Sequence, residues 1–195
     1  MNAKAEIRSL VIARRNAIPA DERIARSKKA CEELERYFGR TVEPGARIAV
    51  YHALGSEVDV SSFAKSALLH GWTCAFPVMV RNDNDAKARM TFWDVPLDGT
   101  RRAFFDKPAR AVTPDDPSLA GCTPCDPHEI DAVVVPMVAF DAGNMRLGYG
   151  DGNYDRFLRE LRSDAVVCGI AFREQKVEAV PTEPHDLALP KIIVA

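Results

Sequence analysis

Apolar residues recur at helical spacing near the start of the chain. Ile7, Leu10 and Val11 fall on one side of a helix, and this pattern predicts an α-helix over residues 2–16. A second helix is predicted over residues 21–38, because its first turn is acidic and suits the positive end of the helix dipole. The sequence therefore predicts an N-terminal pair of helices.

Short apolar runs alternate with a helical pattern in the centre of the chain. Residues 47–52 and 72–79 are typical of buried strands, and residues 59–71 are typical of a helix that ends at Gly71. A strand, a helix and a strand joined by short connections indicate a parallel sheet covered by helices. Later strands are predicted over residues 90–95, 130–140, 165–172 and 176–181, with a helix over residues 154–162.

These elements predict an α/β fold of three layers, in which a mostly parallel sheet is flanked by helices and the helical pair comes first. Residues 96–129 are rich in proline, glycine and aspartate, and we expect them to form a long excursion over the surface. No repeat, low-complexity tract or linker divides the sequence. We therefore expect a single domain over residues 1–195.

The composition is that of a globular protein, with 47% hydrophobic and 28% charged residues and a formal net charge of −2. This balance gives no global basic field, so we expect no nucleic-acid partner. The basic residues before residue 41 are interspersed with glutamates, and most of them are expected to form a solvated helical face. They are Lys4, Arg8, Arg14, Arg15, Arg23, Arg26, Lys28, Lys29, Arg36 and Arg40.

The sequence also bears on location. The first residues lack the uninterrupted apolar segment of a signal peptide, and the most apolar run, residues 132–140, is too short to span a bilayer. Five cysteines without a secretory context indicate reduced thiols. We expect a soluble cytoplasmic protein without a membrane partner.

A glycine-rich loop is the main candidate for chemistry. Gly148, Gly150 and Gly152 alternate between a predicted buried strand and a predicted helix, at the sheet edge where open α/β folds bind ligands. Glycines let backbone amides approach a bound oxyanion, and the helix adds unpaired N–H groups. Arg146 offers a fork of donors for a phosphate, and Asp155 could hold Mg²⁺ beside it. These parts predict a cradle for a nucleoside triphosphate.

The loop alone leaves alternatives open. Three glycines between a strand and a helix also suit a tight connection without a ligand. The loop lacks the Gly-Lys-Ser/Thr of a Walker loop, and its spacing differs from the dinucleotide-binding fingerprint. By itself the motif indicates a phosphate but not which compound carries it.

The stretch VPMVAFDAGNMRLGYGDGNYDRFL resembles the signature of the 5-formyltetrahydrofolate cyclo-ligase family, also called 5,10-methenyltetrahydrofolate synthetases. The similarity covers nearly the whole chain, through an N-terminal Lys and Arg four apart, ADERIARSKKACEEL, GSEVDV and VPTEPHD. It implies an ATP- and Mg²⁺-dependent ligase that cyclises 5-formyltetrahydrofolate to 5,10-methenyltetrahydrofolate and releases ADP and phosphate. The formyl oxygen is phosphorylated on the way. A monomer that binds these small molecules is expected.

The resemblance also implies roles for individual residues. Lys4 and Arg8 share one helical face and match the basic pair that reaches the ATP phosphates, although two solvated charges would have the same spacing. The other ATP-binding positions are Arg146, Leu147, Gly148, Tyr149, Gly150, Asp151, Gly152, Asn153 and Tyr154. The folate-binding positions are His52, Glu57, Tyr149 and Asn153. The magnesium ligands are Asp155 and Asp186.

Two positions depart from the family pattern. Asn153 stands where a tyrosine is usual on the folate side, and Asp151 stands where glycine or lysine is commoner. A carboxylate that faced a triphosphate would repel it, so Asp151 either points outward or lies near the metal. The alternative function is therefore a non-catalytic nucleotide- or folate-binding paralogue of the same fold.

Two further hypotheses come from other classes of protein. Cys122 and Cys125, with His128 beyond them, have the spacing of a zinc half-site or a redox pair, but no second CxxC exists. A sugar-phosphate or CoA-type enzyme on a related α/β fold would need neither ATP nor Mg²⁺. Nucleotide dependence separates it from a cyclo-ligase.

Overall fold

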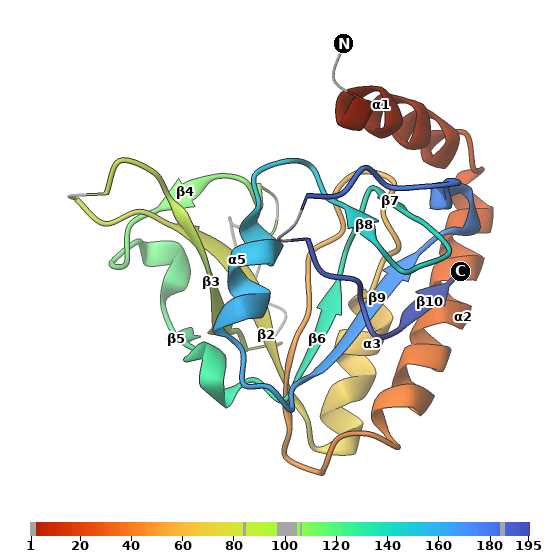
Figure 1. Ribbon diagram of the computed structural model, residues 1–195. Coiled ribbons are helices and arrows are strands. Elements are labelled where there is room, and N and C mark those ends of the chain that lie inside the picture. Colours follow the sequence, from red (N-terminus) through yellow and green to blue (C-terminus); the bar gives the residue numbers. More distant parts are fainter. Residues whose placement is uncertain (1–2, 84, 97–104, 106, 184–185) are drawn as a thin grey trace.

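One main sheet runs through the middle of the molecule (Figure 1). The computed structural model describes residues 3–83, 85–96, 105, 107–183 and 186–195. In these residues eight strands form the sheet, in the order β10-β9-β6-β1-β2-β3-β5, with β4 paired to β2. They are β1 (Arg47–Ala49), β2 (Thr73–Val80), β3 (Arg89–Asp94), β4 (Ala111–Val112), β5 (Thr123–Pro124), β6 (Ala132–Val135), β9 (Val166–Ala171) and β10 (Ile192–Val194).

Most of the sheet is parallel. The strands β10, β9, β6, β1 and β2 pair in parallel, as do β2 and β4, whereas β3 is antiparallel to both β2 and β5. The register places Ile48 opposite Cys74 and Ala132. The carboxyl ends of β1, β2 and β6 therefore meet at one edge of the sheet, where α/β folds bind ligands.

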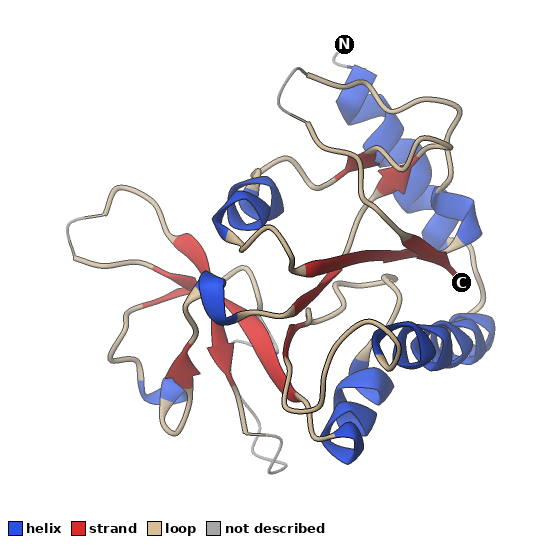
Figure 2. Cartoon of the chain, turned by 60° about the horizontal axis from the view of Figure 1, so that its bottom comes forward, coloured by secondary structure: helices blue, strands red, loops and turns tan. Residues whose placement is uncertain are grey.

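Helices cover both faces of this sheet (Figure 2). On one face, Ile48 and Val134 are buried with Phe63. On the other face, Val133 is buried with Phe157. Successive strand residues point to opposite faces, which is why the run in β6 is apolar throughout. The helices are α1 (Ala3–Asn16), α2 (Ala20–Phe38), α3 (Ser61–Ala67) and α5 (Asn153–Glu160), with short 3₁₀ helices η1 (Leu68–His70), η2 (Pro117–Leu119), η3 (Pro127–Glu129) and η4 (Arg173–Gln175).

This arrangement confirms the predicted fold class. α2 and α3 pack on one face of the mostly parallel sheet and α5 on the other, which gives three layers, and α1 with α2 forms the N-terminal helical pair. The helix that was expected to end at Gly71 does so, with Gly71 in the left-handed conformation at φ 72°. The excursion expected over residues 96–129 lies partly outside the described residues. Its described part contains β4, η2, β5 and η3.

Two strand predictions are wrong. The run 130–140 divides into β6 and β7 (Ala139–Phe140), because Pro136 follows β6 and lacks the N–H that a further ladder bond needs. β7 pairs instead with β8 (Arg146–Leu147) in a small antiparallel sheet. Residues 176–181 form no strand; Lys176 makes an isolated bridge to Phe140.

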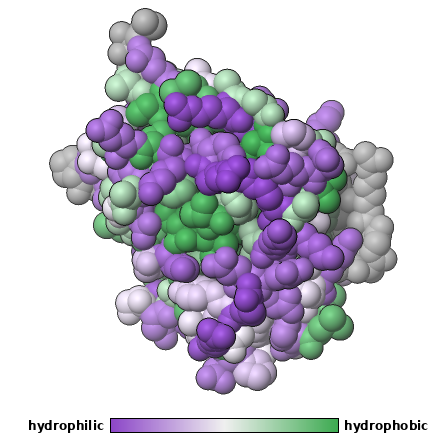
Figure 3. Space-filling view, turned by 90° about the vertical axis from the view of Figure 1, so that its right-hand side faces the viewer, coloured by the Kyte–Doolittle hydropathy of each residue, from purple (hydrophilic) through white to green (hydrophobic). Residues whose placement is uncertain are grey.

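The side of the molecule that carries α2 and β10 is largely hydrophilic, with one hydrophobic area near its centre (Figure 3). Ile24 of α2 and Val194 of β10 are among the exposed apolar residues, at 72% and 47% exposure. In the part of the chain that the structure describes, no helix is long and apolar enough to cross a membrane.

Gly169 in β9 offers a test of the packing between the sheet and the C-terminal segment. A Cβ at this position would lie 2.5 Å from Met137 Cε and 2.6 Å from Leu189 Cδ1, both of them buried. We predict that Gly169→Ala lowers the free energy of unfolding by about 1–3 kcal/mol, as overpacking usually does. Urea denaturation measures this change. The control is Gly148→Ala, whose Cβ would meet nothing within 4 Å; equal stability losses in both variants would contradict the packing argument.

Candidate active site

The candidate site begins where α1 crosses the β7–β8 hairpin. Val11 of α1 is fully buried and packs in one apolar cluster with Val138, Ala139, Leu147 and Val180. Together with Ile7 and Ile12, which pack against the same cluster, this residue holds α1 on the hairpin. The basic residues on the other turns of α1 are placed by the same contact.

Arg8 of α1 lies directly on the glycine loop. Its Nε donates a hydrogen bond of 2.8 Å to the carbonyl oxygen of Gly148. A Cβ at Gly150 would stand 3.3 Å from Arg8 Nη2, and Gly150 has φ +119°. Gly152 has φ +66° and is the N-cap residue of α5. Residues 150 and 152 are therefore glycines for conformational reasons, and residue 150 also because the guanidinium approaches the backbone so closely.

Four predicted phosphate and metal residues gather beside this loop. Arg146 forms an ion pair with Asp155 and donates to the carbonyl oxygen of Leu187 at 3.2 Å. Lys4 Nζ lies 3.6 Å from Asp186 Oδ2 and 2.9 Å from Glu183 Oε1. The four charged groups come from α1, β8, α5 and the C-terminal segment. Only tertiary folding brings them together.

The pKa values reflect this environment. Burial lowers the pKa of Arg146, and the charges of Asp155 and Asp186 oppose that effect. The pKa of Lys4 is raised, first by its hydrogen bond to Glu183 and also by Asp186. The site therefore presents cations that are each paired with a carboxylate.

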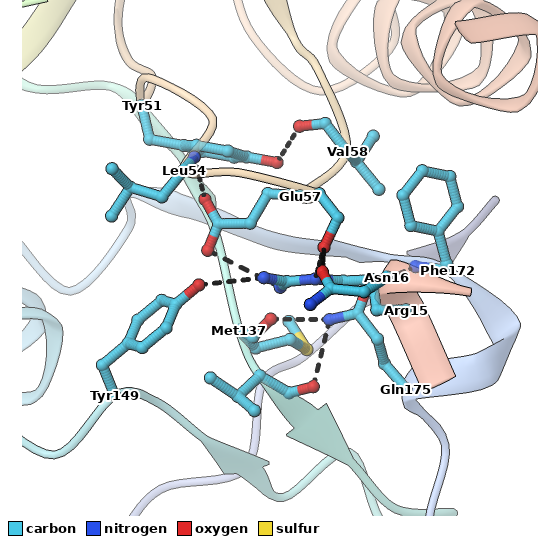
Figure 4. A network of polar contacts seen from close by, with 12 residues as sticks. Arg15, Asn16, Tyr51, Leu54, Glu57, Val58, Met137, Tyr149, Phe172 and Gln175 are labelled. Carbon is cyan, nitrogen blue, oxygen red and sulfur yellow. Dashed lines mark hydrogen bonds and ion pairs between the residues drawn. The ribbon is translucent and has the colours of Figure 1, made fainter. Parts of the chain in front are cut away.

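A second group of residues surrounds Glu57, in the loop after β1 (Figure 4). Glu57 is 7% exposed, and its Oε2 accepts a hydrogen bond of 2.8 Å from the backbone N–H of Leu54. Arg15 Nη1 lies 3.8 Å from Glu57 Oε1, and Arg15 Nη2 donates to the Tyr149 hydroxyl at 3.0 Å. Tyr149 belongs to the glycine loop, so the loop reaches the Glu57 pocket through this side chain.

His52, in the same loop after β1 as Glu57, packs among aromatic rings. The His52 ring lies 3.8 Å from the Phe105 ring and 5.5 Å from the Phe76 ring, measured between centroids. The Tyr154 hydroxyl is buried and has no hydrogen-bond partner among the described residues. Burial raises the pKa of Tyr154, and the Glu57 charge adds to this shift. The Glu57 carboxylate thus lies near three tyrosine side chains, those of Tyr51, Tyr149 and Tyr154.

The two unusual positions lie on the outer side of the loop. Asp151 is exposed, and its carbonyl oxygen accepts a hydrogen bond of 2.9 Å from Arg156. Asn153 Oδ1 accepts from the same guanidinium at 2.5 Å, and its Nδ2 lies 3.9 Å from Met79 Sδ. Asn153 and Arg156 also line a groove of about 460 Å³ along β3. Of the two loop residues predicted to contact folate, Tyr149 faces Glu57 and Asn153 faces this groove.

Comparisons with known proteins agree with this architecture. A family model described as "5-formyltetrahydrofolate cyclo-ligase family" matches residues 1–195. The chain belongs to this family of ligases. It is 27% identical over 192 residues to the 5-formyltetrahydrofolate cyclo-ligase of Mycolicibacterium smegmatis, covering 98% of this chain and 93% of the relative. The predicted family and enzyme class are confirmed.

Solved structures of 5,10-methenyltetrahydrofolate synthetases have the same fold. The 5,10-methenyltetrahydrofolate synthetase of Mycoplasma pneumoniae superposes with a TM-score of 0.73 at 25% identity, covering 98% of both chains. The corresponding protein of Aquifex aeolicus gives a TM-score of 0.67 at 22% identity, covering 99% of this chain and 90% of that one. The similarity to the Aquifex aeolicus protein shows only that the two chains share a fold.

Arg15 is the residue of this cyclo-ligase-like site that sequence reasoning missed. It was expected in a solvated face, but it is only 2% exposed. A signal was present, because Arg15 follows Val11 by four residues and precedes Ile18 by three. A charged residue on the apolar stripe of a helix indicates a buried ion pair more often than a surface charge.

Cys125 of the CTPC motif lines the same groove as Asn153 and Arg156. Cys125 Sγ is 3.2 Å from Asp94 Oδ1, and burial raises the pKa of Cys125 to about 12. A protonated thiol is a poor nucleophile. No group of three or more His, Cys, Asp or Glu side chains arranged for a metal occurs within the described residues.

The contact between Arg8 and Gly150 can be tested by a double-mutant cycle. We predict that Gly150→Ala lowers the free energy of unfolding by about 1–3 kcal/mol, because a side chain at this φ is strained and must displace the guanidinium. In an Arg8→Ala background only the backbone strain remains, so the loss is smaller. Urea denaturation of the four proteins gives the coupling. Additive losses would mean that Arg8 does not lie on the loop in solution.

Proposed function

We propose that this protein cyclises 5-formyltetrahydrofolate to 5,10-methenyltetrahydrofolate with consumption of ATP and in the presence of Mg²⁺. Family membership supports this class of reaction. The observation that carries the proposal is Tyr149, because it links the charged glycine loop to the Glu57 pocket through Arg15. In this proposal the phosphates of ATP bind at the glycine loop and the folate binds beside Glu57, so the two substrates would adjoin each other as a phosphoryl transfer requires.

The chemistry explains why ATP is needed. The oxygen of an N-formyl group is a poor leaving group. Transfer of the γ-phosphoryl group of ATP to this oxygen converts it into phosphate. N10 of the folate then attacks the formyl carbon and closes the five-membered ring, N10 gives up its proton to solvent, and the C–O bond breaks with loss of phosphate. The task of the protein is to align the two substrates and to stabilise charge, as in phosphoryl transfer generally.

The charged residues suit an exchange of partners when ATP binds. Without a ligand, Arg146 pairs with Asp155 and Lys4 with Asp186. In the proposed complex the phosphates pair with Arg146, Lys4 and Arg8. The carboxylates of Asp155 and Asp186 then become available to a cation. Two carboxylates beside phosphate oxygens fit the ligand preference of Mg²⁺. When bound, Mg²⁺ would neutralise charge on the phosphates.

The Glu57 pocket is proposed to hold the pterin ring. Glu57 would accept hydrogen bonds from ring N–H groups, with His52 and Tyr149 against the ring. In this proposal Asn153 lines the groove beside the loop instead of contacting the pterin, as its contacts with Arg156 and Met79 suggest. A single domain, a monomeric state and a cytoplasmic location remain part of the proposal.

A non-catalytic paralogue is the second candidate, and Asn153 is the observation that favours it. Its amide engages Arg156 where a tyrosine is expected in the family. The decisive assay follows the near-ultraviolet absorbance of the methenyl product with purified protein, 5-formyltetrahydrofolate and Mg²⁺, with and without ATP. An ATP-dependent rise supports the cyclo-ligase. A flat trace from folded protein that binds ATP or 5-formyltetrahydrofolate supports the paralogue, and a protein that binds neither refutes both.

We predict that Arg146→Ala lowers kcat/KM by roughly 30- to 1,000-fold, which corresponds to about 2–4 kcal/mol of transition-state stabilisation from one electrostatic donor. The methenyl assay at varied ATP concentration measures the loss. Arg159→Ala is the control, because it removes an exposed arginine from the same region. Turnover of the Arg146 variant at the level of this control would refute the role of Arg146.

Asp155→Asn separates metal binding from phosphate binding. The variant loses a proposed magnesium ligand but releases Arg146 from its ion pair. We predict that turnover with MgATP falls by at least about tenfold, whereas tripolyphosphate without Mg²⁺ binds as tightly as to the wild type or more tightly. Isothermal titration calorimetry provides the affinities. Weaker binding of metal-free tripolyphosphate would show that Asp155 supports the phosphate site itself.

A further inference from the structure

The guanidinium of Arg15 occupies the point where three parts of the site meet (Figure 4). Its Nε donates to Ser56 Oγ at 2.9 Å, and its Nη2 donates to the Tyr149 hydroxyl at 3.0 Å. Its Nη1 faces Glu57 Oε1 at 3.8 Å. Ser56 Oγ in turn donates to Asn16 Oδ1 at 2.5 Å, which fixes the serine to the end of α1. Each edge of the guanidinium therefore has a defined neighbour.

Burying the charged side chains of Arg15 and Glu57 costs free energy, which indicates that the pair has a function. Arg15 is 2% exposed and Glu57 is 7% exposed. Neither Arg15 Nη1 nor Glu57 Oε1 has a hydrogen-bond partner among the described residues, although both atoms are removed from solvent. Buried charged groups are normally fully hydrogen-bonded. A hydrogen-bond donor and an acceptor that face each other, each without a hydrogen-bond partner, are typical of a binding site before its ligand binds.

We propose that Arg15 is a positioning residue, which holds Glu57 as a correctly oriented carboxylate for the folate and ties Tyr149 of the glycine loop to the same pocket. The inference rests on the proposed function for the identity of the ligand. The effect of Arg15 on Glu57 is independent of any ligand. Arg15 acts through Glu57 and Tyr149, which would contact the substrate.

The charge of Glu57 depends on this arrangement. Burial raises the pKa of Glu57, and the Leu54 N–H, Arg15 and Tyr149 lower it. The titratable groups that face Glu57 are Arg15 from α1, Tyr51 from the end of the preceding strand, and Tyr149 and Tyr154 from the glycine loop and α5. Arg15 is the only cation among these. Without it, the pKa of Glu57 would rise further and the carboxylate would become protonated at a higher pH.

The test compares Arg15→Met with Arg14→Met, which removes the exposed neighbouring arginine of the same helix. We expect Arg15→Met to weaken binding of 5-formyltetrahydrofolate on the order of thirtyfold or more, as loss of one partner of a buried charge pair does. Because binding needs the Glu57 anion, affinity disappears as the pH falls through the pKa of Glu57. In Arg15→Met this decrease occurs at higher pH. Arg14→Met keeps the wild-type affinity and pH profile.

A second readout needs no substrate. Carbon-13 NMR of glutamate-labelled protein, with Glu57 assigned by Glu57→Gln, gives the pKa of this carboxyl group directly. It should be higher in Arg15→Met than in the wild type, and Arg15→Lys should restore most of the difference because it keeps the charge. If Arg15→Met does not fold, Arg15→Lys and Arg15→Gln carry the same comparison.

A double-mutant cycle distinguishes positioning from general stability. In a Glu57→Gln background, Arg15→Met should cost less folate affinity than in the wild type, because the part of its action that passes through Glu57 is already lost and only the part through Tyr149 remains. An unchanged pKa of Glu57 in Arg15→Met, or additive losses in the cycle, would overturn the inference. If the wild type itself neither binds nor converts 5-formyltetrahydrofolate, the proposed function fails, while the NMR comparison still decides whether Arg15 controls Glu57.

Discussion

The docking of α1 on the β7–β8 hairpin is the interaction on which the candidate site depends. Val11 is fully buried against Val138, Ala139 and Leu147. Burying one such side chain contributes about 1.5–3 kcal/mol, and it positions every other residue of the helix. Without this contact, the basic residues of α1 would remain on a separate amphipathic helix. The site is therefore formed by the global fold and not by a local motif.

The charged groups show how such a site can exist without a ligand. Arg146 pairs with Asp155, and Lys4 lies near Asp186 and Glu183. Groups of one charge would repel one another at these distances. Here cations and carboxylates alternate, so the charges of the cluster nearly compensate. A bound phosphate and its cation could replace these internal pairs. The internal ion pairs thus keep the side chains close to the positions that a phosphate and a metal would require.

The sequence predicted the parts of the structure that depend on local pattern. Periodicity located the helices and the buried strands, and the glycine loop was recognised by its spacing. The wrong strand at 176–181 has an apolar pattern, but its backbone bonds go elsewhere, as in the hydrogen bond from Val180 N to Asp141 Oδ2. Arg15 was misplaced because its charge outweighed its position on the apolar stripe. Whether an arginine is solvated or paired depends on Glu57, more than 40 residues away. Tertiary contacts of this kind are not encoded in any short window.

Helix geometry explains how the loop tolerates its departures from the family pattern. With 3.6 residues per turn, Asn153, Arg156 and Phe157 lie on one side of α5, and Asp155 lies on the opposite side. Arg156 donates to the side chain of Asn153 on the groove side and to the backbone carbonyl oxygen of Asp151. Asp155 pairs with Arg146 on the other side. Changes at positions 151 and 153 therefore alter the surface that faces β3, while the ion pair beside the glycine loop is held by separate contacts.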